Sequence, residues 1–78
     1  MADAASAMPY ASNDDLPASI RDRLPPHAQD IFRATFNNAW ERHADARDRV
    51  EEIAYRIAWA AVKRRYMKLG DAWVLRPR

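Results

Sequence analysis

The chain has 78 residues, of which 31% are charged, and it contains one glycine and no cysteine. The composition excludes disulfide bonds, and two histidines without cysteine are a poor ligand set for structural zinc, so apolar side chains must hold the fold together. Three tryptophans, three tyrosines and two phenylalanines are available for this purpose. With so little glycine, they favour one small helical domain.

Charge is unevenly distributed, although the net charge is only +2. Residues 1–20 carry three acids and no base, whereas residues 56–78 carry seven bases against Asp71 alone. A basic C-terminal third can attract an acidic protein surface or a nucleic acid. The start of the chain does not have the pattern of a signal peptide, and no stretch approaches the roughly 20 apolar residues of a membrane span. We therefore expect a cytoplasmic protein.

The N-terminal part of the chain predicts a tail, an extended segment and a short helix. Residues 1–7 are small or polar apart from one Met and predict a disordered extension, so that residues 8–78 form a single domain. Met8-Pro9-Tyr10 is typical of a short edge strand. Pro17 suits the first turn of a helix over 17–23, which Pro25-Pro26 ends.

The second helix is predicted from about residue 26 to residue 43. Its apolar residues recur with the helical period of 3.6 and form one stripe. They are Ala28, Ile31, Phe32, Phe36, Ala39 and Trp40. Residues 44–49 follow as a charged loop or as the first exposed turn of the next helix.

The third helix is predicted over about 48–68 and carries two adjoining apolar stripes. Together these stripes exceed the roughly 100° arc of a surface helix, so we expect burial on two sides. The first stripe is Val50, Ile53, Ala54, Ile57, Ala58 and Ala61, and the second is Tyr55, Trp59, Val62 and Tyr66. Gly70 is a typical residue to follow a helix end.

The last residues have strand character between Trp73 and Leu75. We predict a small β-ribbon formed by the N- and C-terminal segments, in which residues 72–76 pair with residues 8–11 over the second stripe. Tyr55, Trp59 and Tyr66 would then be core residues. The predicted fold class is mostly α, with three helices and this ribbon.

Several clusters of uncommon residues occur in a defined order along the chain. They are Met8-Pro9-Tyr10, Asp15-Leu16-Pro17, Leu24-Pro25, His27-Ala28-Gln29-Asp30-Ile31-Phe32, Phe36-Asn37, Ala39-Trp40 and Ala58-Trp59-Ala60-Ala61-Val62-Lys63. From about Met8 to Trp73 the chain thereby resembles the ChaB family. The resemblance implies three helices with a small sheet of terminal segments, and a regulator of cation transport associated with a cation/proton antiporter. It implies no active site.

Two features depart from the family pattern. Residues 1–7 extend beyond the usual start. Pro26 stands where family members commonly carry a polar residue able to cap the second helix, which removes half of a capping box with Gln29. We expect the fold to tolerate both.

The sequence shows no nucleophile motif, glycine-rich phosphate loop or metal-ligand spacing, so we expect no enzyme activity, cofactor or metal. His27 could sense protons or could be a packing or capping residue at a helix start, and we favour the structural role. His43 is interpreted as a helix-end residue near solvent. The acid pairs Asp14-Asp15 and Glu51-Glu52 are interpreted as exposed residues near helix starts.

The candidate partner-binding site is the basic end of the third helix with the terminal tryptophan: Lys63, Arg64, Arg65, Lys68 and Trp73. The basic residues could form an electrostatic docking patch for a protein partner such as a membrane cation transporter, or a solvated face that complements the helix dipole. The alternative function is a small nucleic-acid binder that uses the basic C-terminal third with Tyr66 and Trp73. No groove-reading or RNA-stacking motif accompanies it.

Overall fold

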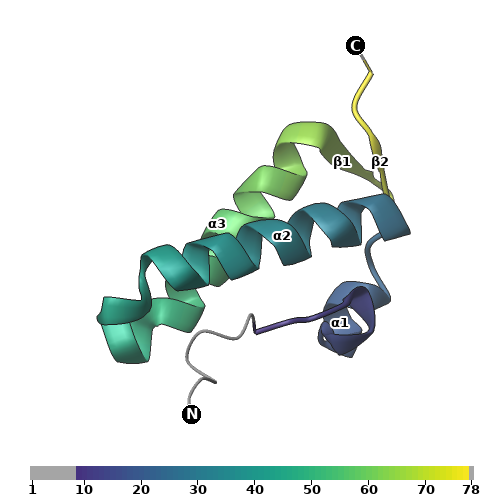
Figure 1. Ribbon diagram of the computed structural model, residues 1–78. Helices are drawn as coiled ribbons and strands as arrows, with labels where there is room; N and C mark the ends of the chain where they lie inside the picture. Colours follow the sequence, from purple (N-terminus) through teal and green to yellow (C-terminus); the bar gives the residue numbers. More distant parts are fainter. Residues whose placement is uncertain (1–8, 78) are drawn as a thin grey trace.

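A computed structural model describes residues 9–77 as two long helices packed side by side, with a short helix at one end and a β-hairpin (Figure 1). The helices are α1 (Ala18–Arg21), α2 (Pro26–Arg42) and α3 (Val50–Arg65), and the strands are β1 (Tyr66–Leu69) and β2 (Ala72–Leu75). Two 3-10 turns, η2 (Asn13–Asp15) and η3 (Ala44–Arg49), precede α1 and α3. The prediction of a mostly helical fold with three helices and a small β-ribbon is confirmed, and α2 lies within one residue of its predicted bounds.

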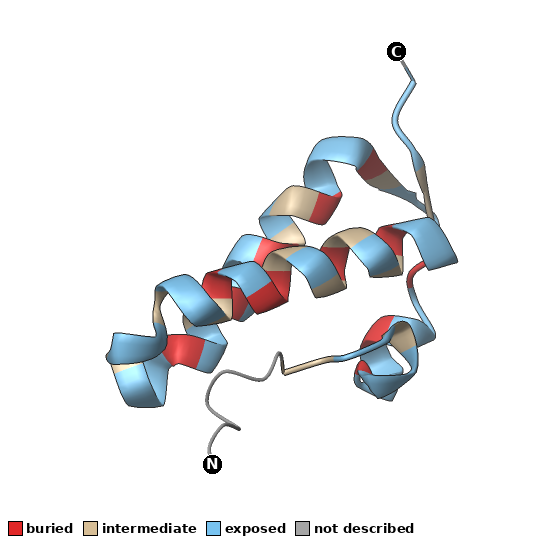
Figure 2. Ribbon diagram, in the orientation of Figure 1, coloured by how far each residue is buried: buried red, intermediate tan, exposed pale blue. Residues whose placement is uncertain are grey.

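The core forms where large residues of α2 meet small residues of α3. Phe32 and Phe36 are fully buried, with ring centroids 5.9 Å apart. The buried residues of α3 recur every fourth position and are Val50, Ala54, Ala58 and Val62. Alanines on one helix leave room for aromatic rings from the other, so the helices approach closely along this stripe. Figure 2 shows buried positions along both helices.

The predicted pairing of the β-ribbon is wrong. β1 pairs antiparallel with β2, with Tyr66 opposite Leu75 and Leu69 opposite Ala72, so both strands come from the C-terminal segment. Residues 9–11 form no strand, whereas residues 1–7 and Met8 lie outside the described residues. A hairpin with a two-residue turn brings neighbouring segments together and needs no distant partner.

The end of α3 explains why the local hairpin forms. The helix ends at Arg65, because Tyr66 already has extended backbone angles, with φ −126° and ψ 154°. Gly70 therefore does not follow a helix but stands at the first central position of the hairpin turn, with φ 60°. A positive φ at this position is what a type II′ turn requires and what glycine adopts without strain.

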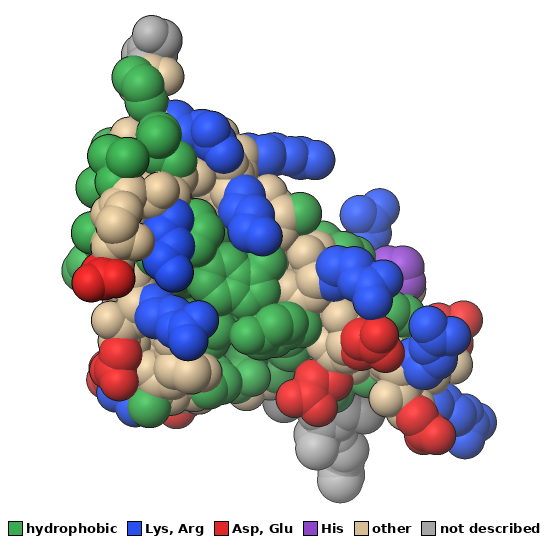
Figure 3. Space-filling model, turned by 180° about the vertical axis from the view of Figure 1, so that it is seen from behind, with side chains coloured by type: hydrophobic (Ala, Val, Ile, Leu, Met, Phe, Trp, Pro, Cys, Tyr) green, Lys and Arg blue, Asp and Glu red, His purple; other side chains and the backbone are tan. Residues whose placement is uncertain are grey.

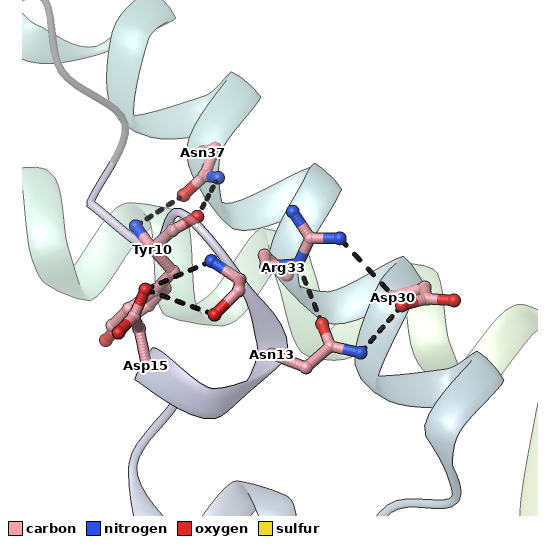
Figure 4. Close-up of polar contacts among 7 residues, drawn as sticks. Tyr10, Asn13, Asp15, Asp30, Arg33 and Asn37 are labelled. Atoms are coloured by element: carbon pink, nitrogen blue, oxygen red, sulfur yellow. Dashed lines mark hydrogen bonds and ion pairs between the residues drawn. The ribbon is translucent and has the colours of Figure 1, made fainter.

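The N-terminal segment is held on α2 by a side chain instead of a strand. The Tyr10 N–H donates to Asn37 Oδ1 over 3.2 Å, and Asn37 Nδ2 donates to the Tyr10 carbonyl over 2.8 Å (Figure 4). Asn37 is 8% exposed, and the Tyr10 ring lies 4.9 Å from the Phe36 ring. The two hydrogen bonds resemble one pair of a β-ladder, so both backbone polar groups of Tyr10 have partners without a second strand.

A second contact joins η2 to the surface of α2. Asn13 Nδ2 donates to Asp30 Oδ1 over 2.7 Å, and Arg33 Nε donates to Asn13 Oδ1 over 2.7 Å (Figure 4). Asp30 and Arg33 are also an ion pair at 3.9 Å. The amide of Asn13 thus bridges an acid and a base that are one helical turn apart, which fixes η2 against α2.

The short helix α1 depends on α2 for its last hydrogen bonds. Gln29 Nε2 donates to the Leu24 carbonyl over 2.8 Å and to the Arg21 carbonyl over 3.3 Å. The start of α2 at Pro26 has no side-chain cap. Because the N-cap is Pro25, Gln29 is one position too late for the capping box that the sequence suggested, and its amide satisfies the end of the preceding segment.

Removal of the Asn37 amide should destabilise the domain. In Asn37→Ala the Tyr10 N–H and carbonyl lose their partners in a partly buried place, so we expect a loss of about 1–3 kcal/mol of unfolding free energy. Urea denaturation followed by circular dichroism measures this loss. Asn38→Ala, an exposed neighbour on the same helix, is the matched control and should lose far less. Equal losses in the two variants would contradict the role of Asn37.

Replacement of Arg47 by glycine should stabilise the domain. Arg47 lies in η3 with φ 55° and ψ −108°, a backbone conformation that favours glycine. We expect Arg47→Gly to raise the unfolding free energy by about 1 kcal/mol, through relief of this strain. Arg49→Gly is the control, because Arg49 has φ −99° and gains nothing from glycine. A lower thermal midpoint for Arg47→Gly would show that the strain is absent.

Candidate partner-binding site

The basic residues predicted for partner binding surround the junction of α3 and β1. Lys63, Arg64 and Arg65 form the last turn of α3, and Lys68 follows in β1; all four are exposed. Within residues 9–77 the ion pairs are Asp30–Arg33 and Glu52–Arg56, so these four cations have no acidic partner there. Their charge is therefore available to solvent or to a binding partner.

The fold divides these residues between two faces. Successive helix residues point about 100° apart, so Lys63 and Arg65 cannot share a face. Arg64 and Arg65 line a hollow of about 620 Å³ together with Leu75, Arg76 and Pro77. Lys63 lies on a different face of α3, which it shares with Trp59 and Ala60. The predicted site is thus two adjoining basic surfaces that meet at the hairpin.

Arg76 belongs to the basic surface of Arg64 and Arg65, and the sequence analysis missed it. Its backbone N–H donates to the Arg65 carbonyl over 2.8 Å, and its Nε donates to the Lys63 carbonyl over 2.7 Å. These carbonyls belong to the last turn of α3, where helical partners are missing. The preference of helix C-termini for cations was the signal that could have identified Arg76. Arg76 joins the hairpin to the helix and adds a third guanidinium.

Trp73 is half-buried against α3 and lies beside Lys68. The two residues are opposite each other in the hairpin, and the Trp73 ring centroid lies 5.5 Å from that of Trp59. Trp59 in turn contacts Phe32 edge to face at 5.5 Å. This chain of rings connects the hairpin to the core, so the cations of the hairpin are carried on a supported surface.

The prediction of a buried aromatic stripe is correct for one of its three residues. Tyr66 is 4% exposed, and its hydroxyl lies 3.1 Å from His27 Nδ1. Trp59 is half-buried, and Tyr55 is 45% exposed, so the expectation that α3 is buried on two sides is wrong. The physical reason is the position of the hairpin. Its Trp73 covers Trp59 but the hairpin does not extend to Tyr55, whereas the predicted ribbon with residues 8–11 would have covered more of the stripe.

The uncovered part of the stripe belongs to an open groove of about 780 Å³ along α3. Figure 3 shows hydrophobic side chains gathered at the centre of the face seen from behind α2, with charged side chains around them. The groove is lined by Asp48, Glu51, Glu52, Tyr55, Arg56, Trp59, Ala60 and Lys63. The spacing of three and four along this row was a signal for a shared face that the sequence analysis assigned to the core.

His27 and His43 have structural positions. The His27 ring joins the start of α2 to Tyr66 at the end of α3, which fits the packing role that we favoured. His43 is half-buried at the end of α2, where its N–H donates to the Ala39 carbonyl over 2.9 Å. Between residues 9 and 77, no three His, Asp or Glu residues are grouped to hold a metal ion. Over the same range, no helix is long and apolar enough to span a membrane.

The architecture defines a class of small helical domain with two long packed helices, the second of which continues into a basic β-hairpin. The ChaB family model matches residues 16–76, which is most of the chain. The chain therefore belongs to the ChaB family, and the resemblance inferred from the residue clusters is confirmed.

Known relatives agree with this assignment. Proteins from Escherichia coli (strain K12) and Shigella flexneri, each named "Putative cation transport regulator ChaB", are 48% identical over 69 residues, covering 82% of this chain and 91% of the relative. An NMR solution structure of a protein with the same name is 44% identical and has a TM-score of 0.77. That similarity covers 88% of this chain and 100% of the solved one.

The Tyr10 hydroxyl should make the stability of the domain fall at high pH. Burial raises the pKa of Tyr10, and the charges of Glu51 and Tyr55 raise this pKa further. The unfolded chain releases the proton near pH 10, whereas the folded chain keeps it to higher pH. Between these values the unfolded state binds fewer protons, so the unfolding free energy falls as pH rises.

Comparison of the chain with Tyr10→Phe isolates this effect, because the variant has no hydroxyl to titrate. We expect the difference in unfolding free energy between the two proteins to be constant below about pH 9. Above about pH 10 the unfolding free energy of the unmodified chain should fall relative to that of Tyr10→Phe. Urea titrations at several pH values measure it. Parallel stability curves up to pH 11 would contradict the prediction.

Proposed function

We propose that this chain is a non-catalytic regulator of cation transport that acts by binding a protein partner through its basic C-terminal surface. The observation that carries the proposal is a group of cations beside a half-buried tryptophan, for which residues 9–77 supply no acidic partner. The surface consists of Lys63, Arg64, Arg65, Lys68, Trp73 and Arg76. The cationic side chains of this surface can bind an anionic partner. Protonated lysine and arginine are not nucleophiles, so the surface suits binding.

The composition of the surface suits recognition by charge followed by apolar contact. Clustered cations accelerate the approach of an acidic partner and orient it. Leu69 and Leu75 of the hairpin are each 58% exposed and add apolar area next to the cations. Tryptophan and arginine are the residues most often found at the energetic centres of protein interfaces. The partner would therefore present acidic side chains around an apolar centre.

The names of the relatives indicate the class of partner. Since they are called cation transport regulators, a membrane transporter for cations, such as a cation/proton antiporter, is the expected partner. The nucleic-acid alternative has less support, because Tyr66 is buried and bonded to His27 and so cannot stack on a base. Trp73 alone would have to serve that purpose.

Binding to a purified cation/proton antiporter in detergent, measured by biolayer interferometry, tests the proposal. We expect Arg64→Glu/Arg65→Glu to weaken binding at least about tenfold and the affinity of the unmodified chain to fall with salt. The control is Arg23→Glu/Arg42→Glu, which changes the net charge equally at exposed positions elsewhere and should bind normally.

Three results would overturn the proposal. They are no binding by the unmodified chain, equal binding by the reversed variant, and equal weakening in the control. A parallel assay with short single-stranded DNA at low salt examines the alternative function. Binding of DNA that Arg64→Glu/Arg65→Glu abolishes, without transporter binding, would favour a nucleic-acid binder.

A further inference from the structure

The groove along α3 is a helix face without a partner in the described part of the chain. Its residues lie at intervals of three and four from Asp48 to Lys63, beside the stripe that packs on α2. At its centre Tyr55 and Trp59 have ring centroids 6.4 Å apart, and Tyr55 is 45% exposed. Exposed aromatic area grouped in this way costs free energy in water and favours association.

The charges of this face differ between its two ends. Asp48, Glu51 and Glu52 lie at one end with Arg56 beside them, and Lys63 lies at the other end. Glu52 lies in the first turn of α3 and Lys63 in the last, and both line the groove. They are eleven positions apart, which corresponds to about 16 Å along a helix. The midpoint falls between residues 57 and 58, at the level of the two aromatic rings. One end of the face is thus acidic and the other basic, at equal distances from an apolar middle.

A face with this pattern complements a second copy of itself. We propose that two copies of the chain pair through the groove, with their α3 helices antiparallel across a two-fold axis. Glu52 would then face the partner's Lys63, and the same contact would recur on the other side of the axis. Tyr55 and Trp59 of both copies would form the shared apolar centre.

Two further features agree with the antiparallel arrangement. Arg56 pairs with Glu52 of its own copy over 3.1 Å, but both side chains are largely exposed, so Glu52 keeps acceptor capacity for the partner's Lys63. The level of Arg56 on the helix also places it near the partner's Trp59, where a guanidinium and an indole face attract each other. The dipoles of the two α3 helices would also run in opposite directions, which is favourable. Because both partners are the same chain, the charges on each side of the proposed interface follow directly from the groove residues.

The dimer does not depend on the proposed function. A dimer would cover Lys63 but would leave Arg64, Arg65 and Arg76 open, because these three line a different hollow. One helix face provides a small interface, below about 1,200 Å², which is the range of weak and transient complexes. We therefore expect a dissociation constant in the micromolar range.

Sedimentation equilibrium between about 5 µM and 1 mM, a range that covers micromolar affinities, tests the proposal. The unmodified chain should pass from monomer to dimer over this range. Lys63→Glu and Glu52→Lys each place like charges opposite one another, so each should raise the dissociation constant about tenfold. The double variant Glu52→Lys/Lys63→Glu exchanges the charges and should restore the dimer.

A mixture of the two single variants makes the test specific for the proposed geometry. One copy then carries lysines at 52 and 63 and the other glutamates, so the mixture should form heterodimers at concentrations where each variant alone is monomeric. Arg64→Glu is the matched control, because it makes the same charge change one residue along and on another face. It should leave dimerisation unchanged while it weakens partner binding, which keeps the two proposals separable.

The proposal fails if the unmodified chain is monomeric at 1 mM, or if Lys63→Glu dimerises as well as the unmodified chain. It also fails if Arg64→Glu weakens the dimer as much as Lys63→Glu does, or if the mixed variants remain monomeric. Circular dichroism of every variant verifies that α3 is folded, so that loss of the dimer can be assigned to the changed charge. The exposed positions of these residues on the helix make unfolding of the variants unexpected.

Discussion

The packing of Phe32 and Phe36 against the alanines of α3 is the contact on which the rest of the structure depends. The two rings fill the space that Ala54 and Ala58 leave open, and they extend outward in both directions through further aromatic contacts. On one side Phe36 meets Tyr10, and on the other Phe32 meets Trp59, which supports Trp73. The N-terminal segment and the hairpin are therefore both packed on one ring pair, and hydrogen bonds from Asn37 and Arg76 complete their attachment.

This dependence explains how a domain of this size presents two different surfaces. The hairpin is held by Trp73 from beneath and by Arg76 at the helix end, so its cations and those of α3 have fixed relative positions. The aromatic contacts end at Tyr55, where the hairpin no longer covers the helix. One region of α3 is thus a charged surface with a rigid support, and the next is an open apolar face bounded by charges.

Sequence reasoning succeeded where a single local pattern decides the structure. The proline pair and the 3.6-residue period placed α2, because both signals act within one segment. The end of α3 was predicted three residues too late, since Tyr66 continues the apolar stripe of the helix while its backbone is already extended. The N-terminal strand was mispredicted because the partner of Tyr10 is the side chain of Asn37, 27 residues away, and no local pattern reveals such a contact.

The candidate site shows the same division between local and distant information. The charges of Lys63, Arg64, Arg65 and Lys68 were evident from composition alone. Their separation into two faces follows from helix geometry, but the contribution of Arg76 depends on a return of the chain that only the hairpin creates. The exposure of Tyr55 was missed for a related reason, because it depends on where the ribbon lies.

The contact between Gln29 and the end of α1 has a consequence for how the chain folds. A helix of four residues is too short to persist alone. Here its last carbonyl, that of Arg21, and the carbonyl of Leu24 after it accept hydrogen bonds from an amide of the next helix. The segment before Pro25 and the beginning of α2 should therefore form and melt as one cooperative unit. During synthesis, residues 9–25 would leave the ribosome without stable structure and would become ordered only after α2 has emerged behind them.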